Sequence, residues 1–276
     1  MTVKHLHYFF NSFHQGHYET RELLKKSMFS EFFDGLYDFT ATLFDHWPLD
    51  SSFRLVLETW LSYIQPWRYK DPNAASEESG TFTPGQWDQF IRENIRFYDD
   101  LLAKVIQGRF FRQELSSSKS SYMLFRIAKV YGQDHLADCV RAIALTCKNN
   151  PSVMGTPVRS GGGGLQRQHH HQHEETFSAF DPKFKSALNE LLLKINEGQF
   201  VLKAKKEKMT RRKTRLDANR QESTLRRIFA WLTESVDEQE IAELNEIDKT
   251  LQYLEESQVR IFSKCRRTSL TSVLVV

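Results

Sequence analysis

The sequence lacks the features that mark several common classes of protein. It has no stretch of about 18 consecutive apolar residues, so no transmembrane helix is predicted and we expect a soluble or peripheral protein. Its N-terminus has no apolar core of the signal-peptide type. Alternation with a period of two, which would indicate strands, is not sustained anywhere. The formal net charge is only +3, so overall charge gives no reason to expect a nucleic-acid partner.

Cysteines and catalytic motifs are also scarce. The cysteines Cys139, Cys147 and Cys265 match neither a disulfide framework nor a CxxC metal site, and they suit a reducing compartment. A phosphodiesterase needs carboxylates or histidines to hold a metal ion. The candidates for this role are isolated: His5 with His7, Asp45 with His46, Asp134 with His135, and the tract HHHQH at residues 169–173. We interpret the pairs as surface or helix-capping groups and the tract as unstructured sequence of low complexity.

Apolar and aromatic residues are abundant and follow helical spacing. Hydrophobic residues make up 40% of the chain and aromatic residues 13%, enough for a substantial core. Apolar residues recur three and four positions apart, which predicts an all-α fold of stacked antiparallel helices, a solenoid-like array. We expect helices near residues 19–46, 51–65, 84–107, 121–131, 134–147 and, in pieces, 181–258. At the third of these, a capping box with Thr83 as N-cap, Pro84 at the first helical position and Gln86 is predicted.

The stretch FRLVLETWLSYIQPWRY, residues 53–69, is rich in aromatic and aliphatic side chains. Its apolar residues fall on one helical face with no lysine among them, which is typical of a buried helix rather than of one that inserts into lipid. We therefore expect Trp60 and Leu61 to be buried against the helix that contains Trp87. Pro66 should end the helix. The best candidates here for surface contact with a membrane or an anion follow it: Trp67, Arg68 and Tyr69.

Composition divides the chain into four parts. These are an N-terminal helical domain at residues 1–148, a linker at 149–180, a helical hairpin region at 181–265 and a tail at 266–276. The linker is rich in glycine, histidine and glutamine and poor in apolar residues, which predicts a long disordered segment.

The C-terminal region separates its charges by sign. Between positions 203 and 227 there are eleven Lys and Arg and three acidic residues, and between 234 and 256 there are nine acidic residues and one lysine. Each half also keeps a thin apolar seam. The pattern predicts a charged antiparallel helical hairpin that turns near residues 233–237, with opposite charges paired across the seam to fix its register.

The basic half of this region has three possible roles. It can attract anionic lipid headgroups, contact nucleic-acid phosphates, or form a solvated face paired with the acidic helix. We favour pairing, because the acidic half supplies about as much negative charge as the basic half needs, although eleven cations cannot all contact one partner helix. No nucleic-acid partner is expected. The candidates for membrane or anion contact are Lys203, Lys205, Lys206, Lys208, Arg211, Arg212, Lys213 and Arg215.

Three stretches carry a resemblance to a known family: FRLVLETWLSYIQPWRY, QFIRENIRFYDDLLAKVIQGRF and YMLFRIAKVYGQ. In the placement of rare tryptophans and prolines, about residues 1–148 resemble the sphingomyelin phosphodiesterase 4 (neutral sphingomyelinase 3) family, and residues 177–265 are compatible with it. The resemblance implies hydrolysis of sphingomyelin to ceramide and phosphocholine with Mg²⁺ as cofactor. It also implies association with membranes of the endoplasmic reticulum, nuclear envelope and Golgi. It transfers no catalytic residue or metal ligand to this chain.

Two functions follow as alternatives. One is a sphingomyelin phosphodiesterase, and the other is a non-catalytic helical scaffold that binds protein partners at the endoplasmic reticulum or nuclear envelope. Members of the family are much longer and end in a membrane anchor, so we expect this chain to be a fragment, an isoform or a truncated form. The isolated metal-ligand candidates and the lack of β-rich segments argue against catalysis by this chain alone.

Overall fold

The computed structural model describes the backbone of residues 2–11, 18–48, 50–69, 82–149, 182–221 and 226–271, and side chains at most of these positions. Within these ranges there is no strand, and the predicted all-α fold is confirmed. The chain divides into two compact units. Unit 1 comprises Met1–Phe111 and Tyr131–Leu188, and unit 2 comprises Arg112–Val130 and Asn189–Val276. The predicted linker, apart from residue 149, lies outside the described residues, so the division predicted from composition stays a prediction.

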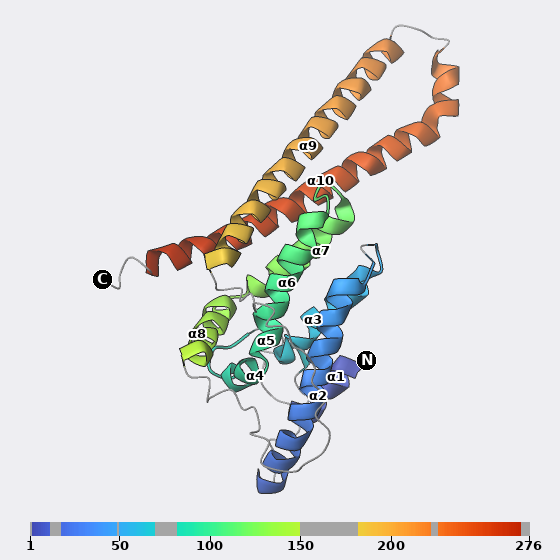
Figure 1. Cartoon of the computed structure of the whole chain (residues 1–276). Coiled ribbons are helices and arrows are strands. Elements are labelled where there is room, and N and C mark those ends of the chain that lie inside the picture. Colours follow the sequence, from blue (N-terminus) through green and yellow to red (C-terminus); the bar gives the residue numbers. More distant parts are fainter. Residues whose placement is uncertain are drawn as a thin grey trace. The chain divides into compact units, whose positions relative to one another are not determined.

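Unit 1 is an assembly of helices (Figure 1), and its core is rich in buried aromatic side chains. In chain order its elements are α1 (Thr2–Asn11), α2 (Tyr18–His46), α3 (Phe53–Tyr63), the 3-10 turn η2 (Pro66–Tyr69), α4 (Asp88–Glu93), α5 (Ile95–Tyr98), α6 (Asp100–Gly108), η3 (Phe110–Arg112) and α8 (Leu136–Asn149). Helix α2 packs on α3 and α6, α1 packs on α3 and η2, and α8 packs on α4 and α5. Helix α1 was not among the helices expected from the sequence.

The predicted burial of Trp60 and Leu61 is confirmed, since their exposed fractions are 1% and 0%. The indole N–H of Trp60 donates to the carbonyl oxygen of Phe97 in α5 at 2.9 Å. Its ring meets the ring of Phe44 in α2 edge to face, with 5.4 Å between centroids. Trp60 thus packs against the segment predicted to contain Trp87, through Phe97 rather than through Trp87. Helix α3 ends before Pro66, as its fixed backbone requires.

The single helix predicted at residues 84–107 is wrong in two respects, because the segment forms α4, α5 and α6 and begins later. Gly85 has φ +83, a left-handed conformation that no helix accommodates, and its N–H donates to the Asp88 carboxylate at 3.0 Å. The helix therefore begins at Asp88, and the predicted capping box does not form. The break between α4 and α5 is at Asn94, whose buried side chain accepts a hydrogen bond from the Tyr63 hydroxyl at 2.5 Å. This hydrogen bond to α3 sets the position of the break.

A buried arginine closes the C-terminus of α2. Arg109 donates through Nε to the carbonyl oxygen of Phe44, through Nη1 to that of Trp47 at 2.7 Å, and through Nη2 to that of Leu43 at 3.3 Å. Its guanidinium also lies 5.0 Å from the centre of the Phe53 ring. The last carbonyls of a helix lack partners within it and carry partial negative charge, so one cation satisfies several of them at once.

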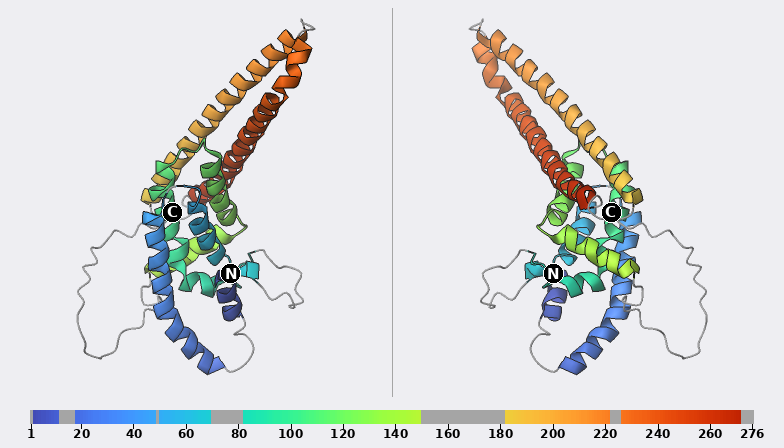
Figure 2. Two further views of the ribbon diagram at one scale, coloured as in Figure 1. Left: turned by 90° about the vertical axis from the view of Figure 1, so that its right-hand side faces the viewer. Right: turned by 90° about the vertical axis from the view of Figure 1, so that its left-hand side faces the viewer.

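Unit 2 is the predicted charged hairpin together with α7 (Ser118–Tyr131). Its long helices are α9 (Pro182–Gln221) and α10 (Arg226–Thr271), which are antiparallel in both orientations of Figure 2. Tyr253 of α10 stacks on Phe125 of α7, with centroids 5.0 Å apart. At Gly198 of α9 a Cβ would lie 3.2 Å from the backbone of Leu115, so glycine permits a close approach there.

The predicted turn of the hairpin is wrong. Residues 233–237 lie inside α10, and the chain passes from α9 to α10 between residues 221 and 226. The prediction placed the turn where the charge changes sign. A change in the sign of charge does not by itself end a helix, however. The sign change is therefore displaced from the turn and falls on one continuous helix.

Candidate functional site

The first part of the basic run pairs with α10. Lys205 Nζ lies 2.6 Å from the Glu243 carboxylate, and Lys203 Nζ lies 3.9 Å from that of Glu255. Lys206 also pairs with Asp248. Further along the seam, the Gln199 amide donates to Gln258 at 3.0 Å. As expected from the sequence, these three lysines meet acidic residues across the hairpin.

The second part of the run has a different environment. Lys208, Arg211, Arg212 and Arg215 are exposed, whereas Lys213 is partly covered. Arg211 pairs with Glu207 of its own helix at 2.5 Å. No acidic side chain that the structure describes forms an ion pair with Lys208, Arg212 or Arg215. The candidate run is thus split: Lys203, Lys205 and Lys206 hold the hairpin, and the cations after them are presented to solvent.

The candidates after Pro66 prove to be mostly covered. The exposed fraction of Trp67 is 0%, and its ring lies 5.1 Å from that of Phe82 and 6.4 Å from that of Trp87, measured between centroids. The expectation that Trp67 is a surface residue is wrong, because η2 turns the chain back and folds the indole inward. Tyr69 is partly buried, and Arg68 alone of the three is exposed.

The interpretation of His7 as a surface or helix-capping residue is wrong, because its side chain is only 1% exposed. The ring of His7 in α1 stacks on Tyr69 at 5.3 Å and on Tyr63 at 5.7 Å between centroids, with Phe90 tilted against it at 5.7 Å. Burial lowers the pKa of His7 to about 4, an effect that the backbone at Tyr63 and Ser62 partly opposes. His7 is therefore a neutral member of an aromatic cluster, while His5 is exposed, so the pair does not converge on one ligand.

One charged cluster joins α2 to α5 and α6. The Arg96 guanidinium lies 3.7 Å from the centre of the Tyr37 ring and within 3.6 Å of the Asp34 carboxylate and 3.7 Å of the Asp100 carboxylate. The Tyr37 hydroxyl donates to Asp100 at 3.4 Å. Burial, helped by the neighbouring charge of Asp99, raises the pKa of Asp100 to about 6. Burial and the Asp100 charge raise the pKa of Tyr37 to about 12. The sequence did not single out this cluster.

The isolated candidate metal ligands stay isolated where they are described. Asp45 pairs with Lys104 at 2.6 Å, and His46 Nδ1 lies 3.0 Å from the Thr42 carbonyl oxygen of its own helix. His135 is exposed at φ 63. Among the described side chains, no group of three or more His, Cys, Asp and Glu residues is placed to hold a metal ion. The tract at residues 169–173 lies outside the described part of the chain.

None of the described helices combines the length and apolar character needed to cross a membrane. Two features of the described chain have potential for recognition or chemistry: the exposed cations of α9 and the cluster around Asp100.

Comparison with known proteins points to one family. The profile of mitochondrial-associated sphingomyelin phosphodiesterase matches residues 1–153. Sphingomyelin phosphodiesterase 4 of Danio rerio is 38% identical over 157 residues, which cover 51% of this chain and 19% of the relative. The Homo sapiens protein of the same name is 37% identical over 153 residues, or 51% of this chain and 18% of the relative. The chain thus spans less than a fifth of these curated relatives. No solved structure matches it significantly.

Proposed function

Because the chain belongs to the mitochondrial-associated sphingomyelin phosphodiesterase family, we propose that it is part of an enzyme that hydrolyses sphingomyelin to ceramide and phosphocholine. The observation that supports this proposal is the family match over residues 1–153, which takes in every helix from α1 to α8. Since the chain covers 18% to 19% of the curated relatives, the reaction is proposed for the larger protein, with this chain supplying a helical part of it.

The proposed setting is a cellular membrane that contains sphingomyelin. The resemblance favours the endoplasmic reticulum, the nuclear envelope and the Golgi, with Mg²⁺ as the cofactor. A magnesium ion would need several carboxylate oxygens around it, and the described residues bring no such set together. We therefore assign no catalytic step and no metal ligand to the described residues, and the proposed role of unit 1 is to support the catalytic region of the larger enzyme.

The second candidate function is a helical scaffold that binds protein partners at the same membranes. It is favoured by large apolar side chains that the described helices leave exposed. The exposed fractions are 60% for Phe39 on α2 and 67% for Val259 on α10. Single exposed apolar residues are ordinary on a soluble protein, so a partner would have to cover several of them.

A hydrolysis assay on the purified chain tests the enzymatic proposal. Labelled sphingomyelin in mixed micelles is incubated with magnesium and then with a chelator, and release of phosphocholine is measured. Release that needs magnesium would show that this chain catalyses the reaction on its own. Loss of that release in Asp100→Asn, but not in Asp34→Asn, would then give the Asp100 carboxyl a role that is not assigned to it here. Both substitutions remove one carboxylate beside Arg96, but Asp100 is much more buried than Asp34, so the melting temperature of each variant is measured as well.

If the chain alone releases no phosphocholine, the same variants are measured in a full-length relative. An active full-length enzyme that loses no activity on removal of the unit 1 region would contradict the supporting role proposed here. A loss of activity when that region is removed, together with a lower melting temperature, would support this role.

A further inference from the structure

Helix α9 carries an apolar patch on the side away from the hairpin seam. The exposed fractions are 68% for Leu193, 75% for Phe200 and 45% for Val201. Buried Ile195 and Leu202 lie on the opposite side of the same helix. With 3.6 residues per turn, Leu193 and Phe200 are seven positions apart and therefore share one face. The patch is not part of the core of unit 2.

The exposed cations continue this face. Counting 3.6 residues per turn, Lys208, Arg211 and Arg215 lie on the same side of α9 as Leu193 and Phe200, about two to four turns beyond Phe200. All three cations are exposed. The whole strip from Leu193 to Arg215 is about 33 Å long at 1.5 Å per residue. We define the outer face of α9 by Leu193, Phe200, Val201, Lys208, Arg211 and Arg215.

We propose that the outer face of α9 docks on the surface of a membrane that carries anionic lipids. Cations near an anionic leaflet are attracted to its headgroups, and apolar side chains beside them can enter the boundary between headgroups and acyl chains. A nucleic acid would satisfy the cations and leave Phe200 and Leu193 in water. A bilayer satisfies both kinds of side chain.

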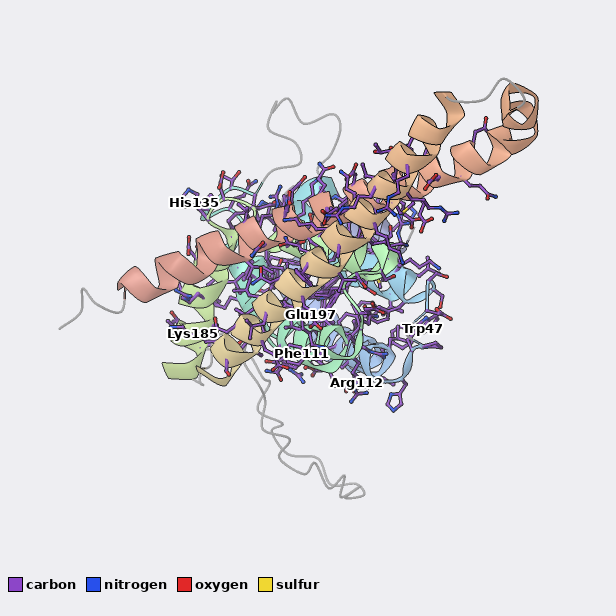
Figure 3. The ribbon with its side chains drawn as sticks, turned by 90° about the horizontal axis from the view of Figure 1, so that it is seen from above. Trp47, Phe111, Arg112, His135, Lys185 and Glu197 are labelled. Atoms are coloured by element: carbon purple, nitrogen blue, oxygen red, sulfur yellow. The ribbon has the colours of Figure 1, made fainter. Side chains whose placement is uncertain are left out.

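The charges on the other sides of the hairpin fix the orientation. Lys203, Lys205 and Lys206 are paired with acidic residues of α10. Other exposed carboxylates of α10, among them Glu238 and Glu246, would be repelled by the same lipids. One acidic side chain, Glu197, lies between Leu193 and Phe200 on the outer face (labelled in Figure 3). Glu207, which pairs with Arg211, is a second acidic side chain beside this face. Lys208, Arg211 and Arg215 outnumber these two carboxylates, so α9 rather than α10 faces the membrane.

This inference does not rest on sphingomyelin hydrolysis, and its test contains no sphingomyelin. The full chain is mixed with vesicles of phosphatidylcholine alone or of phosphatidylcholine with phosphatidylserine, and the bound fraction is measured by sedimentation. Binding should need phosphatidylserine and should weaken as salt rises, because salt screens exposed charges. Equal binding to the two kinds of vesicle, or binding to neither, would overturn the proposal.

Two matched pairs of variants locate the surface. Lys208→Gln with Arg215→Gln should weaken vesicle binding about 30-fold, since each cation near such a membrane contributes about fivefold. Lys205→Gln with Lys206→Gln removes the same charge from the paired side and should weaken binding several-fold less. Equal losses in the two double variants would show that only net charge matters, which would overturn the proposed face.

The apolar half is tested separately. Phe200→Ser should weaken vesicle binding about tenfold by removing an inserted ring, whereas Val259→Ser on α10 should leave it unchanged. A double-stranded oligonucleotide gives the contrasting outcome: stronger binding to it than to vesicles, with no effect of Phe200→Ser, would assign the cations to nucleic acid and overturn the proposal. Melting followed by circular dichroism confirms that each variant is folded.

Discussion

The helix α3 core and the α9–α10 hairpin are held together in different ways. Around α3, large rings are fully buried, and two of them donate buried hydrogen bonds: the Trp60 indole donates to the Phe97 carbonyl oxygen, and the Tyr98 hydroxyl donates to the Ile64 carbonyl oxygen at 2.7 Å. Along the hairpin, a narrow seam that includes Leu202 and Leu254 is buried, and ion pairs between exposed side chains flank it.

The difference predicts where substitutions will matter. In the α3 core, each ring contributes through apolar burial, and Trp60 and Tyr98 also contribute through buried hydrogen bonds. In the hairpin, solvent competes for every flanking charge, and exposed ion pairs contribute little. The core should therefore respond strongly to single changes, and the hairpin should respond weakly to each charge it loses.

Trp60→Ala should have the largest effect. It leaves a cavity in the core of unit 1 and removes the donor to the Phe97 carbonyl oxygen, so it should lower the free energy of unfolding by about 3 to 5 kcal/mol. Trp60→Phe, which keeps an aromatic ring, should cost less. Urea denaturation measures both. An unchanged unfolding midpoint for Trp60→Ala would show that α3 is not the centre of the core.

Arg109→Met should come next, at about 2 to 3 kcal/mol, because it leaves carbonyl oxygens at the end of α2 without their charged donor. Methionine keeps the length and apolar stem of the side chain, so the loss of unfolding free energy measures what the hydrogen bonds contribute. Arg112→Met is the control, since Arg112 is exposed (labelled in Figure 3). If the two variants melted at the same temperature, the capping role of Arg109 would be wrong.

Asp100→Asn should have a smaller effect on the free energy of unfolding, and that effect should depend on pH. The pKa of Asp100 is raised to about 6 in the folded chain from an ordinary value of 3.8, so the folded state binds the proton more tightly than the unfolded state. The contribution of Asp100 to stability should therefore fall as pH rises from 4 to 6, by roughly 1 to 2 kcal/mol. Asp100→Asn removes this contribution, so the difference in unfolding free energy between wild type and variant should change over that range. A constant difference would contradict the raised pKa.

The features that periodicity controls were predictable from the sequence. The all-α fold, the burial of Trp60 and the pairing of opposite charges across a hairpin all follow from residues three, four or seven positions apart. Their signals are local, and each is repeated over several turns of helix.

The features that were not predicted depend on single contacts between distant residues. The break at Asn94 depends on a hydroxyl 31 positions away in α3, and asparagine in a helical pattern gives no such signal. The burial of Trp67 depends on Phe82 across residues outside the described part of the chain. For the candidate surface, the cations were predictable from the sequence, but their separation into paired and outward groups was not, since that separation is set by the position of the turn.

Lys205→Gln should have the smallest effect, and it tests the hairpin side of the comparison. Its partner Glu243 lies 2.6 Å away, yet both side chains are about half exposed, so water and salt compete for the pair. The loss in unfolding free energy should be about 0.2 to 1 kcal/mol at low salt and should shrink as salt is added. Glu243→Gln, alone and combined with Lys205→Gln, completes a double-mutant cycle that isolates the interaction energy of the pair. A coupling above about 2 kcal/mol, or one that salt does not reduce, would show that the pair is shielded from water, and the contrast between core and hairpin would then be wrong.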